Sequence, residues 1–175
     1  MRRMGNLRAA IGAYEHALDI APDDKTTLVN LARVAELTED WERVQRCYSR
    51  LYALDGDNME FAGAYAATLY GLGDYAEAIP VYQKLVAAEA ERPANDYRLG
   101  FCYFSLGRWP EAIATWEVGR RLSPENPTIN LGLVAERGFT TLNDALAHAA
   151  AERCASLGIA VDADLQAQLD ALPAT

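Results

Sequence analysis

Residue types that commonly carry catalysis are few in this sequence and match no catalytic pattern. The two histidines, His16 and His148, lie among polar neighbours in segments with helical periodicity, where a solvated side chain is the usual outcome. The paired acids Asp23 and Asp24 separate two helical patterns, which favours helix capping over acid–base chemistry. No nucleophile elbow, phosphate-binding glycine loop, zinc-protease motif or calcium loop occurs. We therefore predict a protein that is not an enzyme and needs no metal or cofactor.

The cysteines indicate a compartment rather than a site. Cys47, Cys102 and Cys154 are isolated, odd in number and without a CxxC spacing, so the pattern supports neither a zinc site nor a disulfide framework. Small thiols of this kind are typical of a reducing environment. Charged residues interrupt the N-terminal segment where a secretory signal would be apolar. The predicted localisation is cytoplasmic.

One stripe of aromatic residues could carry binding chemistry. Tyr97, Phe101 and Phe104 lie at i, i+4 and i+7, so on a helix they share one face. The packing face of the same helix is already supplied by Leu99, Gly100 and Tyr103. The stripe therefore exceeds what the core requires. It is either an extension of the core or an apolar wall for a ligand.

Composition limits the class of partner. The chain has 175 residues, enough for one domain or one short repeat array. Its 16 Lys+Arg against 25 Asp+Glu give a net charge of −9, which disfavours nucleic acids and anionic membranes as partners. The hydrophobic share of 51% excludes disorder, and no apolar run of about 18 residues predicts a membrane span.

The elements that position these side chains recur at a fixed interval along the chain. One aromatic column consists of Trp41, Tyr75 and Trp109, and another of Tyr14, Tyr48, Tyr82 and Trp116. The segments 71–79 (GLGDYAEAI) and 105–113 (SLGRWPEAI) are nearly identical. Self-similarity with a period of about 34 residues predicts stacked units, and the apolar spacing within each unit predicts two helices joined by a turn.

At these residues the chain resembles the tetratricopeptide repeat family, whose unit is a helix-turn-helix of the same period. The strongest match comprises Leu99, Gly100, Tyr103, Gly107, Trp109, Ala112, Trp116, Gly119 and Pro124. The resemblance implies an all-α, right-handed superhelical solenoid with one domain over residues 1–175. It divides the chain into a partial repeat (1–24), full repeats (25–58, 59–92 and 93–126), a degenerate repeat (127–160) and a C-terminal cap (161–175).

The resemblance also implies a binding surface, because first helices of the family's units line a concave groove. The groove residues predicted here are Asn30, Arg33, Tyr70, Tyr97, Arg98, Phe101 and Phe104. Arg33 and Arg98 would offer paired donors to a carboxylate, and Asn30 would hold a peptide backbone. The carboxylate clamp that some members use for chaperone tails is disfavoured, because Glu60 and Ala64 stand where it needs polar or basic groups.

These observations predict an adaptor or scaffold that binds a peptide or helix of a protein partner. Two alternatives stay open at this point: a chaperone similar to the class II chaperones of type III secretion systems, and a non-catalytic module of a larger enzyme. The truncated first repeat motivates the second alternative. It also predicts an exposed apolar strip on the helix from about Leu7 to Ala21, through which two copies could associate.

Overall fold

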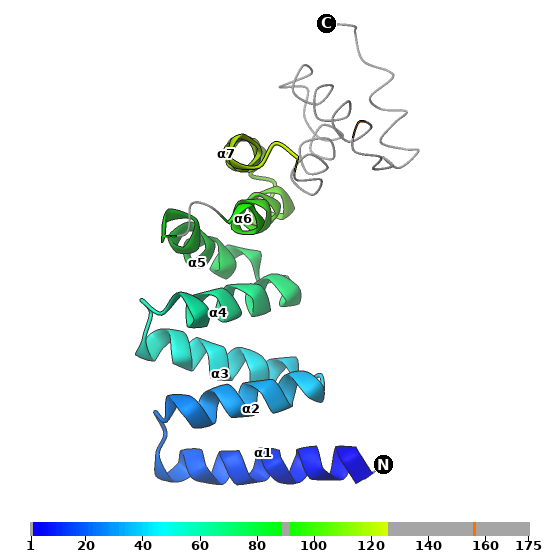
Figure 1. Ribbon diagram of the computed structural model, residues 1–175, viewed down its shortest axis with the longest axis vertical. Coiled ribbons are helices and arrows are strands. Elements are labelled where there is room, and N and C mark those ends of the chain that lie inside the picture. The colour runs from blue at the N-terminus through cyan, green and yellow to red at the C-terminus, as the bar shows by residue number, and fades with distance from the viewer. Residues whose placement is uncertain (1, 89–91, 126–155, 157–175) are drawn as a thin grey trace, which may run out of the picture. The chain divides into compact units, whose positions relative to one another are not determined.

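A computed structural model describes residues 2–88, 92–125 and 156 of the chain, and Figure 1 shows the arrangement of its helices. The elements are α1 (Arg2–Ile20), α2 (Lys25–Leu37), α3 (Trp41–Leu54), α4 (Met59–Leu72), α5 (Tyr75–Ala88), α6 (Pro93–Ser105) and α7 (Trp109–Leu122). No strand occurs in this described part. The all-α helical-repeat fold predicted from the sequence is therefore confirmed.

The helices follow the sequence period. The first helices α2, α4 and α6 begin at Lys25, Met59 and Pro93, so one full period separates each start from the next. The second helices α3, α5 and α7 are spaced by the same period, and each begins at an aromatic residue. One sequence period thus produces one helix pair.

The turn inside each pair has the same backbone conformation in all three copies. Its left-handed residues are Glu39 (φ 58°), Gly73 (φ 84°) and Gly107 (φ 71°). In each turn the following amide donates to the carbonyl five residues earlier, at 2.9 Å; the pairs are Asp40 to Ala35, Asp74 to Leu69, and Arg108 to Tyr103. Glycine adopts this conformation freely, whereas Glu39 places a β-carbon in it at a cost of about 1 kcal/mol.

Polar side chains begin three of the helices. Asp24 accepts a hydrogen bond from the Thr27 amide at 2.9 Å before α2, and Asp40 accepts from the Arg43 amide at 3.1 Å before α3. Asn58 accepts from the Glu60 amide at 3.0 Å before α4. Each cap satisfies an amide that the first helical turn would leave without a partner.

The chain divides into two compact units, an N-terminal unit of residues 1–81 and a C-terminal unit of residues 82–175. In the N-terminal unit α1 packs on α2, α2 on α3 and α3 on α4 (Figure 1). Its core holds Leu28, Leu31, Ala32, Cys47 and Leu51. Ile11, Tyr14 and Leu18 of α1 pack against this core, so the unpaired first helix buries part of its apolar face.

In the C-terminal unit α6 and α7 form a tightly packed pair. Trp116 of α7 is buried over Gly100 of α6, and a β-carbon placed on Gly100 would come within 2.2 Å of the indole Nε1. The absent side chain of Gly100 therefore provides the space that the indole fills. The predicted degenerate repeat at 127–160 and the cap at 161–175 lie outside the described residues, apart from Ser156.

Candidate functional site

The aromatic stripe of α6 packs on the buried tryptophan of α7. The ring centroid of Trp116 lies 6.5 Å from that of Tyr97 and 6.0 Å from that of Phe104. Phe101 lies between the two, with centroids 6.2 Å from Tyr97 and 6.1 Å from Phe104. Tyr97, Phe101 and Phe104 are all half-buried, so each leaves part of its ring surface open to solvent. The stripe is thus partly core and partly surface.

A hydrogen bond fixes the cluster's orientation. The indole Nε1 of Trp116 donates to the backbone carbonyl of Tyr97 at 3.0 Å. This bond satisfies the one polar atom of a side chain that is 1% exposed. Because Trp116 is held from α6 while it packs under the stripe, the aromatic surface is rigid before any ligand arrives.

Arg98 stands beside the stripe on α6 and interacts with a buried tyrosine. Desolvation raises the pKa of Tyr82 to about 12, while the charge and hydrogen bond of Arg98 act in the opposite direction. Arg98 is half-buried, so its guanidinium is positioned rather than freely mobile. A planar donor held next to aromatic rings is suited to a carboxylate or a backbone carbonyl.

The other three groove residues lie in the N-terminal unit. Asn30 is half-buried and Arg33 is exposed, one turn apart on α2. Tyr70 is half-buried near the end of α4 and makes an edge-to-face contact with Tyr75, at a centroid distance of 5.9 Å. The structure thus brings Tyr97, Arg98, Phe101 and Phe104 together on one helix. A continuous groove through both units stays a prediction.

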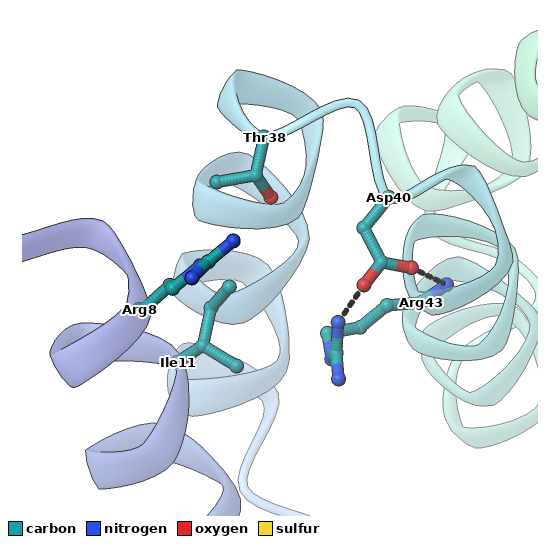
Figure 2. Close-up of a pocket in the computed structure, with 5 residues that line it drawn as sticks. All are labelled: Arg8, Ile11, Thr38, Asp40 and Arg43. Carbon is teal, nitrogen blue, oxygen red and sulfur yellow. Dashed lines mark hydrogen bonds and ion pairs between the residues drawn. The ribbon is translucent and has the colours of Figure 1, made fainter. Parts of the chain in front are cut away.

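A cleft between α1 and α3 was not predicted from the sequence. Figure 2 shows it as a cavity of about 290 Å³ between Arg8 and Ile11 of α1, Thr38 at the end of α2, and Asp40 and Arg43 at the start of α3. The Asp40 carboxylate accepts hydrogen bonds from the guanidinium and the backbone amide of Arg43. Arg43 is consequently neutralised locally.

Two ion pairs join α3 to α1 and to the turn between α1 and α2. Arg43 pairs with Glu15 of α1 at 3.0 Å, and Arg50 pairs with Asp23 at 2.9 Å. Two arginines of α3, Arg43 and Arg50, therefore bridge neighbouring elements. Exposed pairs of this kind contribute little stability each, about 0–1 kcal/mol.

A small apolar cavity of about 140 Å³ lies at one edge of the N-terminal unit. It is lined by Trp41, Ala67, Thr68, Gly71 and Leu72. Trp41 is 49% exposed and Leu72 is 41% exposed, so both present apolar surface to solvent at this cavity. In the sequence, Trp41 is one member of the aromatic column with Tyr75 and Trp109. The repeat pattern does not predict how exposed each member is.

The third feature that sequence reasoning missed is a buried acid. Asp96 of α6 is 1% exposed, and neither carboxylate oxygen has a hydrogen-bond partner. Burial raises the pKa of its carboxyl above the ordinary value, against a smaller lowering by its own backbone amide. The equivalent positions one and two repeats earlier hold the buried apolar residues Ala62 and Leu28. The interruption of that apolar column is the pattern that would have identified Asp96.

Metal and membrane chemistry find no support in the described residues. Within them, no group of three or more His, Cys, Asp or Glu side chains could hold a metal ion. No helix in the same part of the chain combines the length and apolar character needed to span a bilayer. The described cysteines Cys47 and Cys102 are buried free thiols, and desolvation raises the pKa of Cys102 to about 11.

Comparison with protein families places the repeats in a known class. Two family models, both described as tetratricopeptide repeat, match residues 38–96 and 69–133, so together they cover more than half of the chain. Tetratricopeptide repeat protein 8 of Caenorhabditis elegans is 23% identical over 113 residues, which are 65% of this chain and 22% of that protein. The chain spans less than a quarter of the length of the first curated relatives it matches.

Two solved structures illustrate the likeness in fold. YrrB, described as a TPR protein with an unusual peptide-binding site, superimposes with a TM-score of 0.77 at 15% identity, covering 98% of this chain and 87% of YrrB. MamA AMB-1 superimposes with a TM-score of 0.76 at 20% identity, covering 94% of this chain and 90% of MamA. At these identities the comparison shows the fold alone.

Proposed function

Because this chain belongs to the tetratricopeptide repeat family, we propose that it is a non-catalytic adaptor that binds a peptide or helix of a protein partner. The family and the fold support a protein-interaction module. YrrB, which shares the fold and is described as having a peptide-binding site, supports a peptide as the ligand class. The partner's chemistry follows from the surface described above.

The observation that carries this proposal is the rigid, half-buried stripe of Tyr97, Phe101 and Phe104. A partner that covers the stripe would bury apolar surface at about 25 cal/mol per Å² with little entropy lost in ordering the rings. Arg98 beside it would fix the partner's register through a carboxylate or carbonyl. We expect an amphipathic segment with two apolar anchors and a nearby acidic or C-terminal group.

The test is selection of peptides on the purified chain, followed by affinity measurement with a stripe variant. The double variant Tyr97→Ala with Phe101→Ala should weaken binding roughly tenfold or more, because aromatic anchors dominate such interfaces. Leu106→Ala is the matched control, since Leu106 is 44% exposed at the end of the same helix but outside the stripe. Equal affinity in both variants would refute the assignment.

The stripe variant also needs a folding control, because Tyr97 touches Trp116. Circular dichroism and tryptophan emission, to which the buried Trp116 contributes beside Trp41 and Trp109, report whether the helix pair survives the substitutions. Arg98→Gln provides a second arm that leaves every aromatic ring in place. Loss of affinity in Arg98→Gln with an unchanged melt would support the groove without any change in the core.

A second candidate is a repeat module within a larger protein. The observation that favours it is a match to the protein adenylyltransferase fic-1 of Caenorhabditis briggsae, 32% identical over 59 residues, which are 34% of this chain and 12% of that enzyme. In that case the repeats would recruit a substrate for chemistry located elsewhere. Intact mass measurement of the endogenous protein decides it, since a mass near 19.2 kDa would contradict this candidate.

We also propose a cytoplasmic location and association of two copies through α1. Two buried free thiols, Cys47 and Cys102, fit a reducing compartment.

The proposed association of two copies involves α1, because Ile20 at its end is 76% exposed and would be stabilised by burial in an interface. Sedimentation of the wild type and of Ile20→Glu tests the association. If both proteins sediment as monomers, the proposed association is wrong.

A further inference from the structure

A second cleft lies on a different face of α6 from the aromatic stripe. Its volume is about 270 Å³, and it is lined by Val86 of α5, Asp96 and Leu99 of α6, and Ala114, Thr115 and Val118 of α7. Helical periodicity places Asp96 and Leu99 on a different face of α6 from Tyr97 and Phe101, so a ligand on the stripe would not occupy this cleft. Whatever binds here is therefore independent of the peptide surface proposed above.

The cleft has a counterpart two repeats earlier. The residues equivalent to its lining are Leu18, Leu28, Leu31, Arg46, Cys47 and Arg50, and all of them line a cleft of about 520 Å³ in the N-terminal unit. The fold thus forms the same concavity twice. The charged groups differ between the copies: arginines and the carboxylates of Glu15 and Asp19 line the first, whereas Asp96 is the charged side chain among the described residues that line the second.

Among the described residues that line the second cleft, none carries a positive charge to pair with Asp96. The wall positions that hold Arg46 and Arg50 in the first cleft hold Ala114 and Val118 in the second. Both Asp96 oxygens lack a hydrogen-bond partner although the side chain is 1% exposed. Leaving such a group unsatisfied destabilises the fold, and Leu28 shows that the fold accepts an apolar residue at this position.

We propose that this cleft binds the side chain of a lysine carried by a protein partner. The two Asp96 oxygens and the Thr115 hydroxyl give three acceptor atoms, and an ammonium group has three donors to match them. Thr115 donates its own proton to the Glu111 carbonyl at 2.7 Å, which leaves its oxygen lone pairs for the ligand. Val86, Leu99 and Val118 supply apolar surface for the four-carbon stem.

A guanidinium fits this set less well, because its five donors exceed the acceptors in the cleft. For an ammonium to reach Asp96, the side chains over the carboxylate must separate. Val118 is 42% exposed on α7 and Val86 is half-buried on α5, so both lie at the surface where such movement is cheap. The net charge of −9 also favours approach of a basic partner.

The experiment titrates the full chain with n-butylammonium, which reproduces the lysine side chain, and follows backbone amide shifts by NMR. The neutral 1-butanol is the ligand control. We expect saturable shifts at Thr115 and Val118 with n-butylammonium, and affinity about tenfold or more weaker for 1-butanol and for Asp96→Asn. Glu111→Gln is the control variant: it removes a carboxylate on α7 that is already paired with Arg108, and it should leave binding unchanged.

Equal shifts from both ligands, or unchanged binding in Asp96→Asn, would overturn the site. A capped Gly-Lys-Gly tripeptide separates the two sources of an ammonium group. If n-butylammonium binds and the tripeptide does not, the cleft takes a small free amine and the partner-lysine proposal is wrong. Peptide binding to the aromatic stripe should persist in Asp96→Asn, so failure here and failure of the adaptor function are distinguishable.

Discussion

Replacing Gly100 with alanine tests how the α6–α7 pair is built. In an isolated helix the change would stabilise the chain by about 1 kcal/mol, because glycine is a poor helix former. Here the added β-carbon would lie 2.2 Å from Nε1 and 2.5 Å from Cδ1 of Trp116. Both values are far below ordinary van der Waals contact, so the indole must retreat.

The size of the effect follows from what the retreat removes. Overpacking of a buried ring costs about 1–3 kcal/mol. Displacing Nε1 by more than a fraction of an ångström also weakens its 3.0 Å bond to the Tyr97 carbonyl, a further cost of about 0.5–1.5 kcal/mol. Offsetting these against the gain in helix propensity leaves a loss of about 0.5–3.5 kcal/mol.

The measurement is thermal or urea unfolding, with Gly63→Ala as the matched control. Gly63 lies inside α4, and a β-carbon there would meet no atom within 4 Å. The control should therefore stabilise the chain by up to about 1 kcal/mol, opposite in sign to Gly100→Ala. In a Trp116→Leu background, Gly100→Ala should lose most of its cost because the ring is gone. Two variants that stabilise equally would refute the close packing of Gly100 against Trp116.

Three further predictions test individual residues. Glu39→Gly should stabilise the chain by about 0.5–1 kcal/mol in urea unfolding, because it relieves a left-handed glutamate, and a loss would contradict this. Asp96→Leu should raise stability by about 1–3 kcal/mol at neutral pH. Burial raises the pKa of Asp96 when folded, so the wild type gains stability as pH falls through that value, and the advantage of Asp96→Leu should shrink towards about pH 4, where the remaining part is the cost of burying a neutral carboxyl without partners. Cys102, whose pKa burial raises to about 11, should react with a thiol reagent only after unfolding.

The sequence predicts the helix pairs because their local determinants recur in every repeat. The turn after α4 needs a left-handed residue, and Gly73 supplies it at the place that Gly107 occupies one repeat later. The sequence does not predict that Glu39 adopts the same conformation, because the strain is imposed by the hydrogen bonds around it. The sequence also predicts a helix that starts near Leu7, whereas α1 starts at Arg2. The prediction is late because no cap or turn residue marks the beginning of α1.

The candidate site is less predictable because it depends on pairs of helices. Helical spacing places Tyr97, Phe101 and Phe104 on one face, but it does not show that Trp116 of another helix packs beneath them. For Asp96, three helices must be placed before its burial and lack of partners become visible. Periodicity in one segment reports which residues share a face and not what lies opposite.

The residue opposite the stripe differs between equivalent repeats, and this difference gives the same surface position a different chemistry. Trp116 corresponds to Tyr48 two repeats earlier, and Phe104 corresponds to Glu36. In the C-terminal unit the two residues make a ring contact, with centroids 6.0 Å apart. In the N-terminal unit the Tyr48 hydroxyl instead donates to the Glu36 carboxylate at 3.0 Å.

One contact between two helices therefore persists while its chemistry changes from apolar to polar. The change has a packing cause, because the smaller Gly100 replaces Ala32 beneath the larger aromatic ring and admits an indole in place of a phenol. The Tyr48 hydroxyl needs an acceptor, which the Glu36 carboxylate supplies. The indole of Trp116 has no hydroxyl, so the equivalent surface residue can be the aromatic Phe104 without leaving a donor unsatisfied. The residue that fills the core thus also sets the chemistry of the contact that the adjacent surface residue makes.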